Sequence, residues 1–223
     1  VGYQNGIIDI GSTMTDSCVK LANMPAKCSY KRLGSLNDIE ALALSSNYYQ
    51  FIIALGIMGY DYTYNMKAEA SLEHFNTYRN TFASFGLGTS TGIDLPGEST
   101  GLKGTTIAPD LLMNLAIGQY DLYTPVELLQ YINTIANNGS RLKLSLMNSI
   151  KEDDEVVITR NVEELNKVNL ESKYLERIQE GFRSVMKSGT GYWYINQSIA
   201  AAGKTGSSES YIDSDYDGTL ESY

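Results

Sequence analysis

The sequence has few of the residues that metal centres and nucleic-acid interfaces need. It contains two cysteines and one histidine in 223 residues, so soft metal ligands are scarce. Lys and Arg number 17 against 26 Asp and Glu, which gives a formal net charge of −9. This acidic balance, without a basic run, argues against a nucleic-acid partner. No segment reaches the run of about 18 apolar residues that a membrane-spanning helix needs.

The residues that are present favour one helix-rich domain. Hydrophobic residues make up 43% of the chain, which is enough for one sizeable core. No internal repeat and no linker divides it. Capping residues and apolar residues three and four apart predict helices over 36–44, 48–56, 65–85 and 173–187, and one that starts after Thr124. Segment 109–117 is interpreted as either a short helix or a turn. Segments 142–150 and 156–159 are predicted to pair as a hairpin across an acidic turn.

Two of these helices carry more specific predictions. Ser35 is expected to cap the 36–44 helix, which would present Ser45 and Asn47 at its C-terminal end. Thr124, Pro125 and Glu127 form a capping-box start for a helix that ends at Asn138-Gly139. Its predicted buried face consists of Leu128, Leu129, Ile132 and Ile135.

The strongest chemical signal is the segment Lys204-Thr205-Gly206, which is predicted to lie on a strand. Lys204 supplies fixed positive charge, the Thr205 hydroxyl can bind a carboxylate, and Gly206 lets another backbone approach closely. A lone segment of this kind is usually a solvated turn. Its meaning therefore depends on a partner elsewhere in the chain.

That partner is Ser45-Ser46-Asn47, because S-x-N and K-T-G are two of the three motifs of the penicillin-recognising serine acyltransferases. The chain resembles the transpeptidase domain of class B penicillin-binding proteins, and in particular a zinc-carrying subgroup. The resemblance runs along nearly the whole chain, in family order, through A-L-A-L-S-S-N (41–47), T-G-I-D-L-P-G-E (91–98), A-I-G-Q (116–119), T-P (124–125) and A-G-K-T-G (202–206).

The resemblance implies an α+β fold, in which an antiparallel sheet is flanked by helices. In the family, strands from before the nucleophile helix and after the K-T-G strand build that sheet. Residues 1–223 are therefore expected to form a single incomplete transpeptidase domain that is mostly helical. The nucleophile-bearing S-x-x-K segment is expected upstream and the final strands downstream, and this remainder of the domain is an expected partner.

Three segments match S-x-x-K as a string, beginning at Ser17, Ser140 and Ser184. The motif works when it opens a buried helix, since Ser and Lys then lie one turn apart on the same face. Ser17 is soon followed by Asn23-Met24-Pro25, Ser140 enters a predicted strand, and Ser184 lies near the end of a helix. None of the three is predicted to be the nucleophile, and the chain alone is expected to be inactive.

By resemblance, the function is that of a peptidoglycan D,D-transpeptidase, which cross-links D-Ala-D-Ala stem peptides through a serine acyl-enzyme and is inhibited by β-lactams. Ser45 would relay a proton, aided by Lys204, and Asn47 would bind the substrate amide. Thr205, with Gly206 beside it, would bind the terminal carboxylate, and the Ser207 N–H would form half of the oxyanion hole. A β-lactam sensor domain and a serine β-lactamase are the alternatives.

The resemblance also implies a location and further partners. The protein is expected at the extracytoplasmic face of a bacterial cell membrane. Its membrane anchor is expected outside this chain, together with a glycosyltransferase partner. The sequence does not indicate whether division, elongation or sporulation is served.

The scarce soft ligands predict a structural zinc site. Cys18 and Cys28 flank a loop before the Ser45 helix, Asp16 lies two residues before Cys18, and His74 lies on a later helix. Two thiolates, an imidazole and a carboxylate can complete a tetrahedral Zn²⁺ shell, with no open position for catalysis. A Cys18–Cys28 disulfide, natural for an extracytoplasmic protein, is the main alternative, and free thiols are another.

Overall fold

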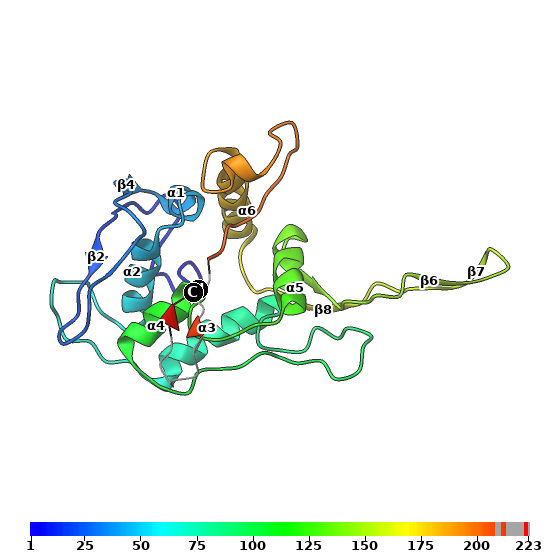
Figure 1. The fold of residues 1–223 in the computed structure, drawn as a ribbon, viewed down its shortest axis with the longest axis horizontal. Helices are drawn as coiled ribbons and strands as arrows, with labels where there is room; N and C mark the ends of the chain where they lie inside the picture. The colour runs from blue at the N-terminus through cyan, green and yellow to red at the C-terminus, as the bar shows by residue number, and fades with distance from the viewer. Residues whose placement is uncertain (208–210, 213–220, 223) are drawn as a thin grey trace.

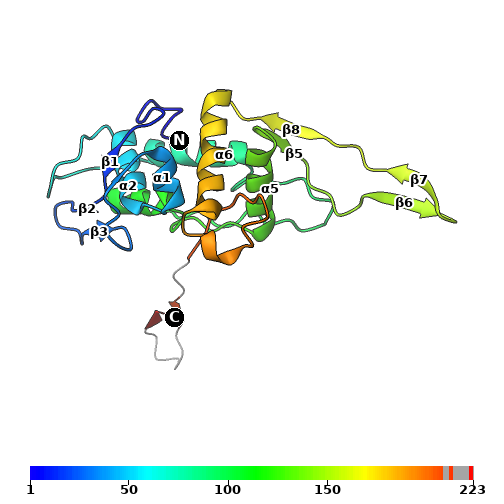
Figure 2. The same cartoon turned by 90° about the horizontal axis from the view of Figure 1, so that it is seen from above.

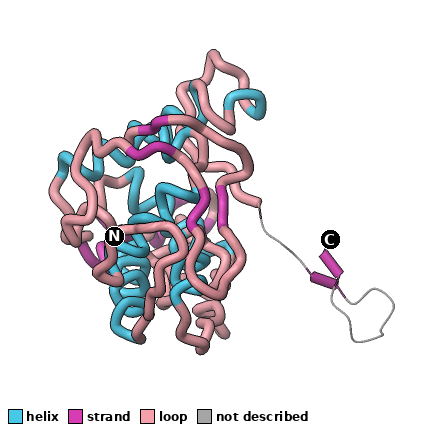
Figure 3. Tube along the Cα trace, turned by 90° about the vertical axis from the view of Figure 1, so that its left-hand side faces the viewer, coloured by secondary structure: helices cyan, strands magenta, loops and turns pink. Residues whose placement is uncertain are grey.

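The computed structural model describes residues 1–207, 211–212 and 221–222. The helices are α1 (Asp38–Ala43), α2 (Asn47–Ile57), α3 (Leu72–Phe85), α4 (Pro109–Ala116), α5 (Pro125–Ala136) and α6 (Ser172–Lys187), and a short 3₁₀ turn, η1 (Tyr192–Tyr194), follows α6. Figure 1 shows these helices gathered in one body, and Figure 3 shows the long loops that join them. No helix of the described residues is long and apolar enough to cross a membrane.

The strands are short and form antiparallel pairs. The pairs are β1 (Met14–Thr15) with β4 (Ser35–Leu36), β2 (Cys18–Val19) with β3 (Lys27–Cys28), β5 (Ser140–Leu142) with β8 (Glu164–Lys167), β6 (Ser149–Glu152) with β7 (Glu155–Thr159), and β9 (Tyr211–Ile212) with β10 (Glu221–Ser222). Helices together with antiparallel strand pairs place the fold in the α+β class, as predicted. The predicted strand at Lys204 is wrong, because residues 201–207 form a loop and no described strand pairs with them.

The main core lies where α2, α3 and α4 meet. Phe51 and Leu55 of α2, Phe75 of α3, and Leu112 and Leu115 of α4 are all fully or almost fully buried. A second core joins the end of α3 to α5 and α6 through Phe85, Ile135, Val168, Leu175 and Phe182. Burial of these apolar side chains is what holds the helices in one body.

The helix starts differ from the predictions in two places. Asn37, rather than Ser35, caps α1. Its side-chain oxygen accepts from the Glu40 N–H, and the Glu40 carboxylate accepts from the Asn37 N–H. Ser35 instead pairs with Thr15 in the β1–β4 pair. Helix α3 begins at Leu72 after its cap Ser71, and not at residue 65, because the preceding segment takes part in a turn with Asn65 in a left-handed conformation.

Helix α5 starts as predicted, but of its four predicted core residues only Ile135 is buried. The capping box of Thr124 and Glu127 is present. Glu127, Gln130 and Thr134 are fully buried, whereas the predicted core residues Leu128, Leu129 and Ile132 are 47%, 62% and 40% exposed. The reason is that α5 packs on backbone groups that need partners, at the end of α3, in the loop after it and in β5. Glu127 accepts from the Gly88 N–H, Gln130 donates to the carbonyls of Thr91 and Leu142, and Thr134 donates to that of Phe85.

Helix α6 is found as predicted, whereas the predicted hairpin is shifted along the chain, because only residues 149–150 of the segment 142–150 lie in β6 and Leu142 pairs with β8 instead. Helix α6 buries Leu175, Phe182 and Val185, as its spacing predicted. The β6–β7 hairpin turns at Asp153 and Asp154, and Figures 1 and 2 show it reaching away from the helices. Helices α1 and α6 are joined by a paired contact in which the Arg177 guanidinium donates two bonds of 2.7 Å to the Asp38 carboxylate. This contact positions the site described next.

Candidate active site

The candidate site is built around the corner between α1 and α2. Helix α1 ends at its cap Leu44, and Ser45 follows with φ 57°, a left-handed conformation that is uncommon for residues other than glycine. Ser46 is the N-cap of α2, and Asn47 is the first residue of that helix. The sharp turn leaves Ser45 and Asn47 half-buried while Ser46 is buried. The chain therefore projects Ser45 where two helices meet.

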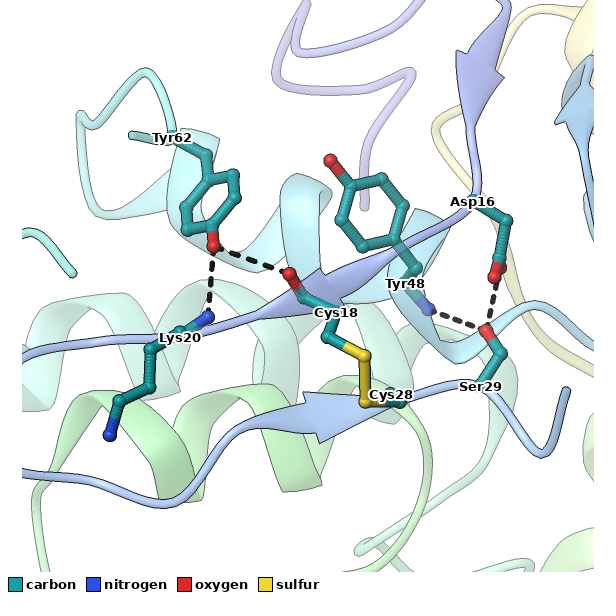
Figure 4. The surroundings of a disulfide bond; sticks show 7 residues. All are labelled: Asp16, Cys18, Lys20, Cys28, Ser29, Tyr48 and Tyr62. Atoms are coloured by element: carbon teal, nitrogen blue, oxygen red, sulfur yellow. Dashed lines mark hydrogen bonds between the residues drawn. A yellow bond between two sulfur atoms is a disulfide. The ribbon is translucent and has the colours of Figure 1, made fainter. Parts of the chain in front are cut away.

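Asp16 holds this corner in place. Its carboxylate accepts bonds of 2.6 Å from the hydroxyls of both Ser46 and Ser29. The Ser46 oxygen in turn accepts from the Tyr49 N–H, and the Ser29 oxygen accepts from the Tyr48 N–H, so the start of α2 is fixed from two sides. Figure 4 shows Asp16, Ser29 and Tyr48 together beside the cysteine pair. Sequence reasoning assigned Asp16 to a metal and missed this role.

The second part of the site comes from the far end of the chain. The Lys204 ammonium donates a bond of 2.8 Å to the Ser45 hydroxyl oxygen and another of 2.9 Å to the Thr205 carbonyl. Burial lowers the pKa of Lys204 below its ordinary value, because the charged form loses solvation. The structure thus brings together two of the predicted catalytic residues. Asn47 lies two residues from Ser45, and Gly206 and Ser207 lie exposed just after Thr205.

Thr205 is positioned by a residue that the sequence reasoning missed. The hydroxyls of Thr205 and Thr190 share a hydrogen bond of 2.7 Å. Thr190 is itself anchored to α1, since its N–H donates to the Ala43 carbonyl. The preceding Gly189 is required for this approach, because a Cβ there would lie 2.2 Å from the Ala43 oxygen. The glycines on either side of Thr190 are the only sequence signal of this close packing.

None of the three S-x-x-K strings forms the nucleophile arrangement in the described residues. Ser17 lies in the extended segment before β2, Ser140 begins β5, and Ser184 lies in the last turn of α6. None of these serines opens a helix. The prediction that they are not the nucleophile agrees with this placement.

The four predicted zinc ligands are not assembled. Cys18 and Cys28 face each other across β2 and β3 and are joined in a disulfide, which is the alternative that the sequence left open (Figure 4). His74 completes the capping box of α3, where its Nδ1 accepts from the Ser71 N–H. Asp16 bonds to two serines. The described residues contain no group of three or more His, Cys, Asp and Glu able to hold a metal ion.

The assembled groups favour binding of an anion next to a proton donor. The Lys204 ammonium contacts the Ser45 hydroxyl, and the Thr205 hydroxyl lies on the next residue. An ammonium with neighbouring hydroxyls suits a carboxylate or a developing oxyanion.

Comparison with known proteins agrees with this chemistry. The family model described as penicillin binding protein transpeptidase domain matches residues 1–222. The chain is 38% identical over 220 residues to penicillin-binding protein 2A of Bacillus subtilis (strain 168), a match that covers 95% of this chain and 31% of that protein. Penicillin-binding protein 2B of Streptococcus pneumoniae (strain R6) is 36% identical over 231 residues, with 95% and 34% covered.

A solved structure supports the same relationship. That of penicillin-binding protein 2B from Streptococcus pneumoniae (strain R6) superposes with a TM-score of 0.87 and 32% identity. The match covers 99% of this chain and 38% of that one. The chain therefore spans about a third of the length of the relatives that it matches.

Proposed function

The chain belongs to the penicillin-binding protein transpeptidase family, and we propose that the complete protein is a serine-type, class B peptidoglycan D,D-transpeptidase. It cross-links stem peptides that end in D-Ala-D-Ala, and β-lactams acylate it. The observation that carries this proposal is the contact of Lys204 with Ser45 beside Thr205, since it assembles the K-T-G and S-x-N motifs from opposite ends of the chain.

In the proposed reaction, the hydroxyl oxygen of a serine from another part of the protein attacks the carbonyl carbon of the penultimate D-Ala. A C–O bond forms, the amide C–N bond breaks, and the terminal D-Ala leaves with a proton on its nitrogen. The proton lost by the attacking serine balances the one that the leaving nitrogen gains, with Ser45 as the relay. An acceptor amine then attacks the ester carbonyl carbon. A C–N bond forms, the ester C–O bond breaks, and the proton that the amine loses returns to the serine oxygen.

The number of hydrogen bonds that a hydroxyl can make supports the role given to Ser45. A hydroxyl has one donor hydrogen and two acceptor lone pairs. Because the Lys204 ammonium donates to the Ser45 oxygen, it occupies a lone pair and leaves the hydroxyl hydrogen free to point elsewhere. We assign that hydrogen to the leaving nitrogen. The positive charge of Lys204 favours the negative charge that develops on the oxygen as it donates.

The neighbouring residues would hold the substrate. Thr205 would donate to the terminal carboxylate, with the backbone at Gly206 open to its approach. Asn47 would bind an amide of the peptide, and the Ser207 N–H would donate to the oxyanion, a contact worth roughly 3 kcal/mol to the transition state. The protein would act at the extracytoplasmic face of the membrane, anchored by a segment outside this chain and working beside a glycosyltransferase.

Fluorescent penicillin tests this assignment in the full-length protein. Wild type should be labelled at one serine outside this chain, and Thr205→Val should be acylated about tenfold more slowly through loss of a carboxylate donor. Thr205→Ser keeps the hydroxyl and should stay close to wild type. Slow deacylation and cross-linking of lipid-linked strands would separate a transpeptidase from a β-lactamase and a sensor. Labelling of Thr205→Val at the wild-type rate would remove Thr205 from the site.

A further inference from the structure

The 3₁₀ turn η1 presents two large aromatic rings to solvent. Trp193 is 88% exposed and Tyr194 is 82% exposed, and Trp193 is the single tryptophan of the chain. Tyr192 packs edge-on against Trp193, with ring centroids 4.8 Å apart. We call Trp193 and Tyr194 the aromatic ridge. Exposed rings of this size usually mark a contact surface, because leaving them in water forgoes the free energy of burial.

The ridge is held on a rigid support. The Gln197 side-chain amide donates to the carbonyls of Tyr192 and Met186, at 2.8 and 3.2 Å, and so ties the turn to the end of α6. Gly191 packs so closely on this helix that a Cβ would lie 2.5 Å from the Met186 sulfur. A preorganised pair of rings loses little conformational entropy when it binds a ligand.

The ridge also lies close to the candidate active site. Trp193 is three residues after Thr190, so their Cα atoms are at most about 11 Å apart. Thr190 contacts both the Thr205 hydroxyl and the Ala43 carbonyl. A peptide of five extended residues spans about 17 Å. A substrate whose carboxylate lies at Thr205 is therefore long enough for its far end, and whatever is joined to that end, to reach the ridge.

The segment that carries the ridge is uncharged, and the nearest charge that the structure shows on it is the Arg183 guanidinium, which donates to the Ala201 carbonyl. Residues 188–203 contain no Asp, Glu, Lys or Arg, although the chain as a whole has a net charge of −9. The exposed polar groups beside the rings are the amides of Asn196 and Gln197 and the hydroxyl of Ser198. The Gln197 nitrogen donates to backbone carbonyls and the Asn196 oxygen accepts from the Ser198 N–H, so the Gln197 oxygen and the Asn196 nitrogen are the amide atoms that remain for a ligand. Flat aromatic faces flanked by neutral hydrogen-bonding groups suit a neutral saccharide, whose ring has apolar C–H faces and polar edges. They do not suit an ionic ligand, which would seek charges of opposite sign.

We propose that Trp193 and Tyr194 form a saccharide-binding subsite that holds the glycan strand of the substrate beside the reacting stem peptide. The inference rests on the proposed transpeptidase function for the identity of the substrate. The pyranose C–H faces stack on the two rings, the Asn196 amide nitrogen donates to the sugar hydroxyl and acetamido oxygens, and the Gln197 amide oxygen accepts from a sugar hydroxyl or acetamido N–H. The subsite orients the strand and leaves acylation by small β-lactams unchanged.

Binding of chitohexaose, a neutral β-1,4-linked N-acetylated oligosaccharide, to the full-length protein tests the subsite. Trp193→Ala should bind it about fivefold more weakly than wild type, the effect expected from losing one aromatic stacking contact. Trp193→Phe, which keeps a flat ring, should recover most of the affinity. Tyr64→Ala removes an aromatic that is also 80% exposed and should change nothing.

Acylation by fluorescent penicillin, measured on the same variants, separates this inference from the proposed function. All variants should be acylated at the wild-type rate, which also shows that they are folded. Equal affinity of wild type and Trp193→Ala for chitohexaose, with acylation intact, would overturn the subsite alone. If wild type were not acylated, the proposed function would be overturned. The affinity for chitohexaose would still test the subsite. If wild type instead bound lipid vesicles but not chitohexaose, and Trp193→Ala abolished the vesicle binding, the ridge would be a membrane contact. That result would contradict the proposal.

Discussion

The ammonium of Lys204 lies 2.8 Å from the hydroxyl oxygen of Ser45, although the two residues are 159 positions apart in the chain. Ser45 reaches this contact from a left-handed backbone conformation, with φ 57°. Such conformations cost of order 1 kcal/mol or more for residues other than glycine and tend to occur at functional sites. A serine in this strained conformation therefore agrees with a chemical role for its hydroxyl.

Replacing Ser45 should separate stability from activity. Ser45→Gly relieves the backbone strain and should keep the free energy of unfolding within about 1 kcal/mol of wild type. It also removes the proposed proton relay, so acylation by penicillin should fall by about a hundredfold. Ser45→Ala is the matched variant, since it loses the hydroxyl but keeps the strain. Denaturant unfolding and acylation kinetics of the full-length protein measure both effects. Wild-type acylation in either variant would show that Ser45 does not relay the proton.

Asp16 is predicted to support the site through Ser46. Asp16→Ala leaves two hydroxyls without their acceptor, one of them buried, and should lower the free energy of unfolding by about 1–3 kcal/mol. Asp61→Ala, at an exposed position, is the control and should change little. If Asp16 supports the site through Ser46, then Ser46→Ala should lower the free energy of unfolding by less in the Asp16→Ala background than in wild type. Strict additivity of the two changes would argue against the coupling.

The motifs of the site could be predicted because they depend on residue type and order. Ser45, Asn47, Lys204 and Thr205 are identified because S-x-N and K-T-G match two motifs of a known family in family order, and the structure places the Lys204 ammonium against the Ser45 hydroxyl. The role of Asp16 could not be found in this way, because a carboxylate beside a cysteine suits a metal site and a hydrogen-bonded corner equally well. Only the fold shows that Ser29 and Ser46 surround it.

Helix α5 shows why periodicity alone assigns the wrong face. Its apolar residues are spaced as a buried stripe, yet Leu128, Leu129 and Ile132 are exposed in the described structure and Gln130 is fully buried. The pattern gives the period of a helix, but it does not identify the surface on which the helix packs. Here that surface includes backbone groups at the end of α3, in the loop after it and in β5, which select polar side chains that can satisfy them. The capping box was predictable because it depends on neighbours in sequence alone.

The cysteine pair is predicted to be a disulfide in the isolated protein. Intact mass under non-reducing conditions should be about two daltons below the value for free thiols, and no zinc should remain after dialysis, because zinc binds thiolates. Reduction should lower stability by about 2–3 kcal/mol through release of the loop closed by Cys18 and Cys28. Stoichiometric zinc with both thiols free, and its loss in His74→Ala, would instead establish the zinc site that the sequence predicted.

The Asp38–Arg177 pair predicts a loss of stability in acid. Burial raises the pKa of Asp38, but the hydrogen bonds from Arg177 and Tyr3 outweigh it and hold that pKa at about 2. Because the folded pKa is below the usual value of about 3.9, the stabilisation is complete above pH 4 and is lost as pH falls towards 2. Arg177→Met leaves a buried carboxylate unpaired and should cost about 3 kcal/mol at pH 7.

Unfolding by urea at pH 7 and pH 3 measures this dependence. The difference between the two pH values should shrink in Arg177→Met, because Asp38 then no longer has a strongly lowered pKa. Arg32→Met, at an exposed position, should keep the wild-type difference. An unchanged pH dependence in Arg177→Met would show that the pair does not govern acid stability.

The acylation rate of Lys204→Ala in the full-length protein tests the proposed active site most directly. The change removes the positive charge and the bond to Ser45, so the rate constant for reaction with fluorescent penicillin should fall by about a hundredfold or more. Lys151→Ala, which removes an exposed lysine on the β6–β7 hairpin, provides the matched control and should react at the wild-type rate. Acylation of Lys204→Ala as fast as that of Lys151→Ala would contradict the assignment of Lys204 and Ser45 to the catalytic site.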